Sequence, residues 1–292
     1  MANYNYFTKK IIKKFESVND FANFIKNTPK TNSGIKYGAS EREENPESIR
    51  KFYYTENFEA ANKLLLTGDF ETAKKINNIN NLKDTINGHG TTKKNVLRYN
   101  NVGFLPIVPK VLAGQPQNML TIRRENTSSS KVLTICYNCS VPYYIKPEDM
   151  IKTAANVASV IKQLENNGYR VNLYVCSCAY SGKTFATIIT KLKAAGEYLD
   201  TLRLAYPFIN PSFLRRHIFA CLERLKGFTT LKCQSMVPYD YTANEAIKDA
   251  FGKTDIKILS YRLCENKNVE DIIKKAIANA VKKEDIINNF TL

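Results

Sequence analysis

The sequence predicts an α/β fold of three layers, in which helices cover both faces of a mainly parallel sheet that contains one antiparallel strand. Two short apolar runs support this prediction, at 132–136 and 171–176, because runs this rich in β-branched residues are typical of strands buried on both faces. An amphipathic segment separates them. A strand, a helix and a strand in this order predict a right-handed βαβ unit with parallel strands.

The helix between these two strands has clear start and stop signals. Pro147 suits the first helical position, and Glu148 and Asp149 place negative charge in the first turn, where the helix dipole favours it. Apolar residues then recur at helical spacing as far as Leu164. The Asn-Asn-Gly sequence at 166–168 predicts the end of the helix.

The chain after this unit continues the alternation of strands and helices. A tight turn at 180–183 predicts a hairpin, so that 184–192 returns as an antiparallel strand. We expect further helices at 213–226 and 244–251, another strand at 255–264 and a weaker one at 233–238. An amphipathic helix is expected at 268–290.

The chain before the unit is less regular, and we predict a small N-terminal helical region at 1–95 and the α/β core domain at 96–292. After a basic amphipathic start, Ser17 is expected to cap a short helix. A helical hairpin broken at Gly68 follows, and 77–95 is expected to be an exposed connection. The segment 96–126 has scattered prolines and glycines, so we expect it to wrap irregularly around the sheet.

The charge balance favours polyanionic partners. The chain has 43 Lys and Arg against 27 Asp and Glu, a net charge of +16, and cations that bind phosphates gain from counterion release. A plain excess of surface lysine is the alternative. The sequence lacks an apolar run of about 18 residues and a signal peptide, so we expect a cytoplasmic protein with no membrane contact. Seven cysteines, mostly on predicted strands, indicate reduced, buried thiols.

Basic and aromatic residues form the candidate nucleic-acid surface. A basic face is predicted on the helix at 213–226, and other cations are expected to contribute from the segment before the sheet. Tyr99, Phe104, Tyr143 and Tyr144 offer surfaces on which bases can stack. The alternative is a solvated face with buried tyrosines. The candidate cations are Arg98, Lys110, Arg123, Arg124, Arg215, Arg216, Arg224 and Lys226.

Catalytic motifs are weak. Lys183 and Thr184 match the end of a P-loop and define a candidate nucleotide site, but a strand is predicted after them, which favours a hairpin turn. The pairs 136/139 and 176/178 contain four cysteines that suit zinc, although core thiols are the simpler interpretation. Only His89 and His217 are available as imidazoles, and no catalytic triad is evident. We therefore expect a binding protein rather than an enzyme, with no cofactor unless it is magnesium.

The segment Asn138-Cys139-Ser140-Val141-Pro142 resembles the metal-binding Asp-x-Ser-x-Ser of von Willebrand factor A-like domains, and the order of elements over 131–292 is similar to their Rossmann-like arrangement. In this resemblance Asn138 stands for the aspartate, Ser140 matches the first serine and Pro142 replaces the second. Asp240 would be the distal carboxylate. The resemblance implies a degenerate magnesium site and a protein–protein adaptor that engages an acidic partner.

The segments 58–70, 102–119 and 203–219 resemble uncharacterised bacteriophage proteins, which implies action in the cytoplasm of an infected bacterium. Our leading hypothesis is a non-enzymatic phage protein that contacts nucleic acid, or a nucleic-acid-handling complex, through a basic surface. A von Willebrand A-like adaptor for a protein partner is one alternative, and a divergent nucleotide hydrolase is another. The sequence leaves the oligomeric state open.

Overall fold

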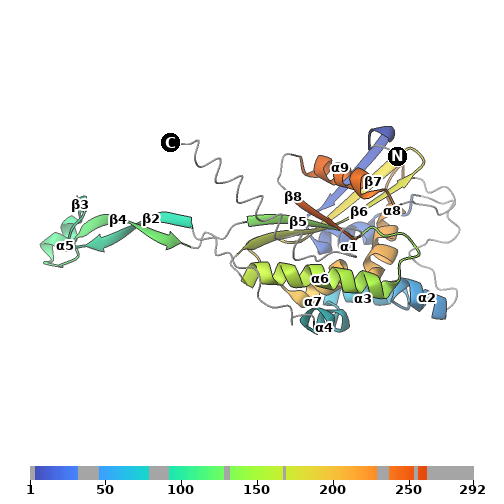
Figure 1. Cartoon of the computed structure of the whole chain (residues 1–292), viewed down its shortest axis with the longest axis horizontal. Helices are drawn as coiled ribbons and strands as arrows, with labels where there is room; N and C mark the ends of the chain where they lie inside the picture. Colours follow the sequence, from blue (N-terminus) through green and yellow to red (C-terminus); the bar gives the residue numbers. More distant parts are fainter. Residues whose placement is uncertain are drawn as a thin grey trace.

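The computed structural model describes residues 4–31, 46–78, 92–127, 132–166, 169–228, 237–252 and 256–261. Its main sheet has the strand order β1-β7-β6-β5-β8, and every neighbouring pair is parallel except β6 with β7 (Figure 1). The predicted fold class, a mainly parallel sheet with one antiparallel pair, is confirmed. The strands are β1 (Lys9–Phe15), β5 (Val132–Asn138), β6 (Arg170–Ser181), β7 (Thr184–Lys193) and β8 (Ile256–Ser260).

The predicted βαβ unit is β5, α6 (Pro147–Asn166) and β6. The two strands are parallel over seven residues, from Val132 opposite Arg170 to Asn138 opposite Cys176. The helix buries its apolar face, including Met150 and Leu164, as its helical spacing predicts. The expected hairpin follows: β6 and β7 are joined by Gly182 and Lys183, and Gly182 has φ +56°, a conformation that glycine adopts readily.

Helices cover both faces of the sheet, which completes three layers (Figure 1). One face packs against α6, α7 (Thr201–Ile209), α1 (Val18–Asn27) and α3 (Phe58–Thr67), and against the helical run formed by η3 (Phe213–Ile218) and α8 (Phe219–Leu222). The other face packs against η1 (Tyr4–Tyr6) and α9 (Asp240–Phe251). Each interface has its own hydrophobic cluster.

The N-terminal region contains the expected helices and one strand that the sequence did not indicate. Ser17 caps α1 by accepting a hydrogen bond from the Asp20 N–H at 3.0 Å. The helical hairpin breaks at Gly68, between α3 and α4 (Phe70–Asn78), and α2 (Pro46–Tyr53) precedes it. The basic start, however, is β1, which pairs in parallel with β7 at one edge of the sheet. The division at residue 95 stays a prediction.

The segment predicted to wrap around the sheet is instead a separate β-ribbon, which we call the arm (residues 92–127). β2 (Thr92–Asn100) pairs antiparallel with β4 (Met119–Thr127), β3 (Leu105–Pro106) adds to β4, and α5 (Val108–Leu112) lies at the tip. The arm extends away from the rest of the described chain, which we call the body (Figure 1). The expectation of an irregular, buried segment is therefore wrong. Its prolines and glycines are concentrated between the two long strands, where they do not interrupt the ladder.

Gly103 shows why the tip requires one of its glycines. A Cβ atom at this position would lie 2.0 Å from the Leu120 carbonyl oxygen of β4. The neighbouring Phe104 N–H donates to that same oxygen at 2.8 Å. The chain can therefore approach β4 closely only without a side chain here.

Several expectations fall outside the described residues: His89, the helix at 268–290, and residues 233–236 of the weak strand at 233–238. The exposed connection at 77–95 is described only at its two ends. Among the helices described between residues 4 and 261, none is long and apolar enough to cross a bilayer.

Candidate nucleic-acid interface

The arm concentrates positive charge. Residues 92–127 contain six cations and one acid, so a segment of 36 residues has a net charge of +5 out of the +16 of the whole chain. The acid is Glu125. The cations are Lys93, Lys94, Arg98, Lys110, Arg123 and Arg124. The structure thus brings together four of the eight cations that the sequence analysis named, because all four belong to this one ribbon.

The register of β2 and β4 assigns arm residues to two faces. Arg98 lies opposite Thr121, and Arg123 follows Thr121 by two positions, so Arg98 and Arg123 share a face as diagonal neighbours. Both side chains are exposed. We call this side of the ribbon the basic face. Diagonal neighbours on a sheet have Cα atoms about 7–8 Å apart, so two extended guanidinium groups can reach separate phosphates.

Toward the tip, the opposite side of the ribbon is apolar, and we call Leu97, Tyr99, Leu120 and Ile122 the apolar face. Leu97 lies opposite Ile122 and Tyr99 opposite Leu120, and the exposed fractions of Leu97, Tyr99 and Ile122 all exceed one half. The Lys110 Nζ lies 3.4 Å from the centroid of the Tyr99 ring, in a cation–π contact. A β-sheet normally covers one face with another layer. This face instead presents aliphatic and aromatic groups to the solvent.

Arg215 and Arg216 are not on the surface. Their residues are 2% and 0% exposed, and their guanidinium groups donate to backbone carbonyls: Arg215 to Phe52 and Ile145, each at 2.5 Å, and Arg216 to Thr55 at 3.0 Å. Burial lowers the pKa of Arg215 to about 10, which still leaves it charged at neutral pH. The expectation of a solvated basic face is wrong for these two residues, because the end of α2, the segment after it and the loop after β5 cover that side of η3.

The other two cations of this region, Arg224 and Lys226, lie on the body and not on the arm. Arg224 is half-buried, and its guanidinium donates to the carbonyls of Thr28 and Ala220, each at 2.9 Å. Lys226 is exposed. The structure therefore separates the candidate cations into an arm group and a largely structural group. The alternation of apolar and polar residues along 97–100 and 120–123 was the signal that could have identified the ribbon.

His217 is a structural residue. Its ring is fully buried, with Nε2 2.9 Å from Asn62 Oδ1 and Nδ1 2.8 Å from the Tyr206 hydroxyl. Because an amide oxygen only accepts, Nε2 carries the proton and Nδ1 accepts from Tyr206. Burial and the neighbouring Arg216 lower the pKa of His217 to about 3. The imidazole is therefore neutral near pH 7 and has no access to a substrate.

The residues matched to the von Willebrand A motif do come close together, at the carboxyl end of β5. Asn138 Oδ1 accepts from the Ser140 N–H at 3.1 Å, and Asn138 lies opposite Ser260 in the sheet. The Ser260 hydroxyl donates to Asp240 Oδ2 at 2.8 Å. This arrangement brings one carboxylate, one amide and two hydroxyls to the same edge of the sheet.

The donor set at this edge does not fit magnesium well. Ser140 Oγ accepts from the Cys178 N–H at 2.7 Å, and it lies 3.2 Å from the Cys178 carbonyl oxygen and 3.0 Å from Ser177 Oγ. These partners use the hydroxyl's hydrogen-bonding capacity. Asp240 supplies the single carboxylate, whereas hard cations favour several charged oxygens. We therefore derive no chemistry through a metal here.

The cysteines are core residues in the part of the chain that the structure describes. Cys136, Cys139, Cys176 and Cys178 are buried and free. Burial raises the pKa of Cys139 to about 12 and that of Cys178 further still, so these thiols are protonated near neutral pH. Within the described ranges, no group of three or more His, Cys, Asp or Glu side chains could hold a metal ion.

The nucleotide candidates lie at the hairpin. Lys183 is an exposed turn residue, and Thr184 begins β7 rather than a helix. A P-loop needs a helix N-terminus after the loop so that backbone N–H groups converge on the phosphates. This turn lacks that helix, and the expectation of a hairpin at this place is confirmed.

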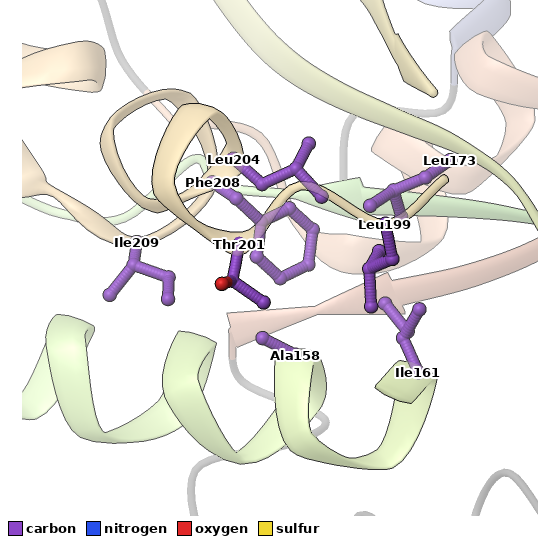
Figure 2. A pocket seen from close by; sticks show the side chains of 8 residues that line it. All are labelled: Ala158, Ile161, Leu173, Leu199, Thr201, Leu204, Phe208 and Ile209. Carbon is purple, nitrogen blue, oxygen red and sulfur yellow. The ribbon is translucent and has the colours of Figure 1, made fainter. Parts of the chain in front are cut away.

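A cavity between α6 and α7 is too small for a ligand (Figure 2). Its volume is about 20 Å³, close to the space of one water molecule, and its lining is almost wholly apolar. Small-molecule sites have volumes of about 300–1,000 Å³ and a few convergent polar groups. The side chains around it are those of Ala158, Ile161, Leu173, Leu199, Thr201, Leu204, Phe208 and Ile209. It is a packing defect of the core.

Comparison with known proteins identifies a family without assigning an activity. No curated protein and no solved structure matches the chain. A family model described as a domain of unknown function, DUF7192, matches residues 3–260, which include the body and the whole of the arm. The phage origin and the von Willebrand A-like assignment stay predictions. The chain belongs to the DUF7192 family.

Proposed function

We propose that this protein binds nucleic acid, without catalysis, through the arm. The observation that supports the proposal most directly is that a ribbon extending from the body has six cations and one acid, with Arg98 and Arg123 together on its basic face. A two-stranded ribbon is narrow enough to enter the major groove of B-DNA, which is about 12 Å wide. The setting we propose, the cytoplasm of an infected bacterium, rests on the sequence resemblance alone.

The length of the ribbon matches an extended series of phosphate contacts. Nine residues of antiparallel strand span about 30 Å at about 3.4 Å per residue. Contact of four of the six cations with phosphates gives a slope of about −3.6 for the logarithm of the binding constant against the logarithm of the salt concentration. Binding should therefore weaken steeply between low and physiological salt.

The test is fluorescence anisotropy of labelled single-stranded DNA, duplex DNA and RNA over a salt series. The arm variant is Arg98→Gln with Arg123→Gln. The matched control is Arg170→Gln with Arg203→Gln, which removes the same charge from exposed arginines of the body. We expect the arm variant to bind more weakly and with a shallower salt slope than the control. Equal losses in the two double variants would assign binding to net charge and reject the arm as the site.

We propose a protein-docking surface at the carboxyl edge of the sheet as a second candidate. Four exposed tyrosines favour it: Tyr143 and Tyr144 in the loop after β5, and Tyr239 and Tyr241 beside Asp240. Tyrosine is enriched in protein interfaces. Cross-linking from a photoreactive residue at position 143 should capture one partner reproducibly in cells, and the Tyr143→Ser, Tyr241→Ser variant should lose it. Indiscriminate capture, or capture that this variant retains, would count against the docking surface.

A further inference from the structure

The tip of the arm has more exposed apolar surface than phosphate binding requires. On α5, Val108, Val111 and Leu112 are at helical spacings of three and four, so they share one side of the helix. Leu112 is 83% exposed and Val108 61% exposed. We propose, on the basis of the function proposed above, that this tip is a wedge that inserts into the base stack of duplex DNA and bends it.

Hydrogen bonds within residues 107–118 order the tip, and a wedge requires such order. The Ile107 N–H donates to the Asn118 carbonyl at 2.8 Å, which joins the two ends of the tip. The Val111 N–H donates to Ile107 at 3.0 Å, and the Gln115 N–H to Lys110 at 3.0 Å. The apolar side chains therefore project from an ordered turn of chain. Less conformational entropy is lost when such a preorganised group inserts.

The chemistry of α5 favours a base stack over a single strand. Proteins that bind single strands stack bases on aromatic rings, whereas the exposed apolar side chains on α5 are aliphatic. The exposed aromatic rings of the arm, Tyr99 and Phe104, lie outside this helix. Apolar side chains such as Leu, Ile, Met, Phe and Pro insert between base steps, partly unstack them and kink a duplex. Pro106 and Pro109 flank the start of α5 and limit its flexibility.

A basic arm with an apolar tip could also insert into an anionic membrane. The positions of the cations along the arm favour a duplex instead. Lys93 and Lys94 lie at the body end of β2, about 20 Å of strand from Asn100. An inserted tip penetrates about 5–10 Å into a membrane interface, and the charge of the surface is screened within about 8–10 Å. Those lysines would lie too far from a membrane surface, but they lie beside phosphates if the ribbon follows a groove.

The experiment measures DNA bending by energy transfer between fluorophores at the two ends of a duplex of about 30 base pairs. We expect the unmodified protein to bend it by about 40° or more, within the range of known wedges, and to bend duplexes with central TA steps more than A-tract duplexes. The tip variant is Val111→Ser with Leu112→Ser. The matched control is Leu66→Ser, which replaces an exposed leucine of α3.

Loss of bending in the tip variant, with the salt slope unchanged and the control still bending, would support the wedge. Salt-dependent binding without bending by the unmodified protein would overturn the wedge and leave the proposed function intact. Absence of nucleic-acid binding would overturn both. Vesicles of phosphatidylserine and phosphatidylcholine serve as a second probe, and tip-dependent binding to them without DNA bending would reject the duplex in favour of a membrane.

Discussion

Acidification should destabilise the fold through His217. The pKa of this imidazole is lowered to about 3 in the folded protein, against an ordinary value of 6.5, because the ring is buried and faces Arg216. The folded state therefore excludes a proton that the unfolded chain binds below pH 6.5. The stability associated with the neutral ring is fully present above about pH 6.5 and is lost as the pH falls toward 3.

The size of this effect follows from the two pKa values. At pH 5 the imidazole is almost fully protonated in the unfolded chain but neutral in the folded protein. The free energy of unfolding is therefore about 2 kcal/mol lower at pH 5 than at pH 7.5. The groups that face the ring are the Tyr206 hydroxyl, the Asn62 amide, Arg216 and the rings of Phe21, Phe58 and Phe213. Of these, none titrates between pH 5 and 7.5, which isolates the imidazole within this cluster.

The assay is urea denaturation at pH 7.5 and at pH 5.0, with the free energy of unfolding extrapolated to water. The chain has two histidines, so His89→Gln is the matched control for His217→Gln. We expect the difference in stability between the two pH values to shrink by about 2 kcal/mol in the His217 variant and to stay unchanged in the control. An undiminished difference in the His217 variant would refute the reasoning, whatever the stability of that variant at pH 7.5.

Three other predictions concern the arm and the core. DNA affinity should fall between 50 and 200 mM salt in both the unmodified protein and the Arg98→Gln, Arg123→Gln variant. If each arginine contacts one phosphate, the fold-decrease in the variant should be about 12 times smaller than in the unmodified protein, as measured by anisotropy. Gly103→Ala should disorder the tip while leaving the body folded, because the new Cβ would lie 2.0 Å from a carbonyl oxygen of β4. Faster amide hydrogen exchange confined to 100–120 would show this. Protection equal to that of the unmodified arm would contradict it. Lys193→Met should lower the free energy of unfolding by about 3 kcal/mol in urea denaturation, because the buried Glu165 carboxylate loses the ammonium group that lies 2.7 Å away. Adding Glu165→Gln should restore part of this loss. If the effects of the two substitutions are purely additive, the ion pair does not contribute as predicted.

Local patterns predicted the core of the fold because the pattern and the tertiary environment agree there. The strand-forming runs of β5 and β6 become buried on both faces toward their carboxyl ends, and α6 has start and stop signals that the structure uses. The arm was missed for a physical reason. Prolines and glycines were taken as evidence against regular structure over the whole of 96–126, although they lie only between the two strands.

The buried arginines show a second limit of local patterns. Helical periodicity places Arg215 and Arg216 opposite an apolar face, and that rule assumes solvent on the far side of the helix. Here the end of α2 and the segment after it cover the far side, and the backbone carbonyls of Phe52, Thr55 and Glu56 accept hydrogen bonds from the two guanidinium groups. Only long-range packing determines which cations of a basic protein remain available to a partner.

The topology places the two candidate surfaces at opposite ends of one strand. The arm precedes β5, whose first residue is Val132, and the tyrosine-rich edge follows its last residue, Asn138 (Figure 1). Seven residues of parallel strand separate the two ends by about 20 Å. Since β5 is an interior strand that separates these two ends, a nucleic acid on the arm and a protein at the carboxyl edge would not compete for the same surface. Substitutions in the arm should therefore leave capture at the carboxyl edge unchanged, and substitutions of the tyrosines should leave the salt slope of DNA binding unchanged. If either set of substitutions alters the other activity, the two surfaces are coupled through the sheet or are parts of a single interface.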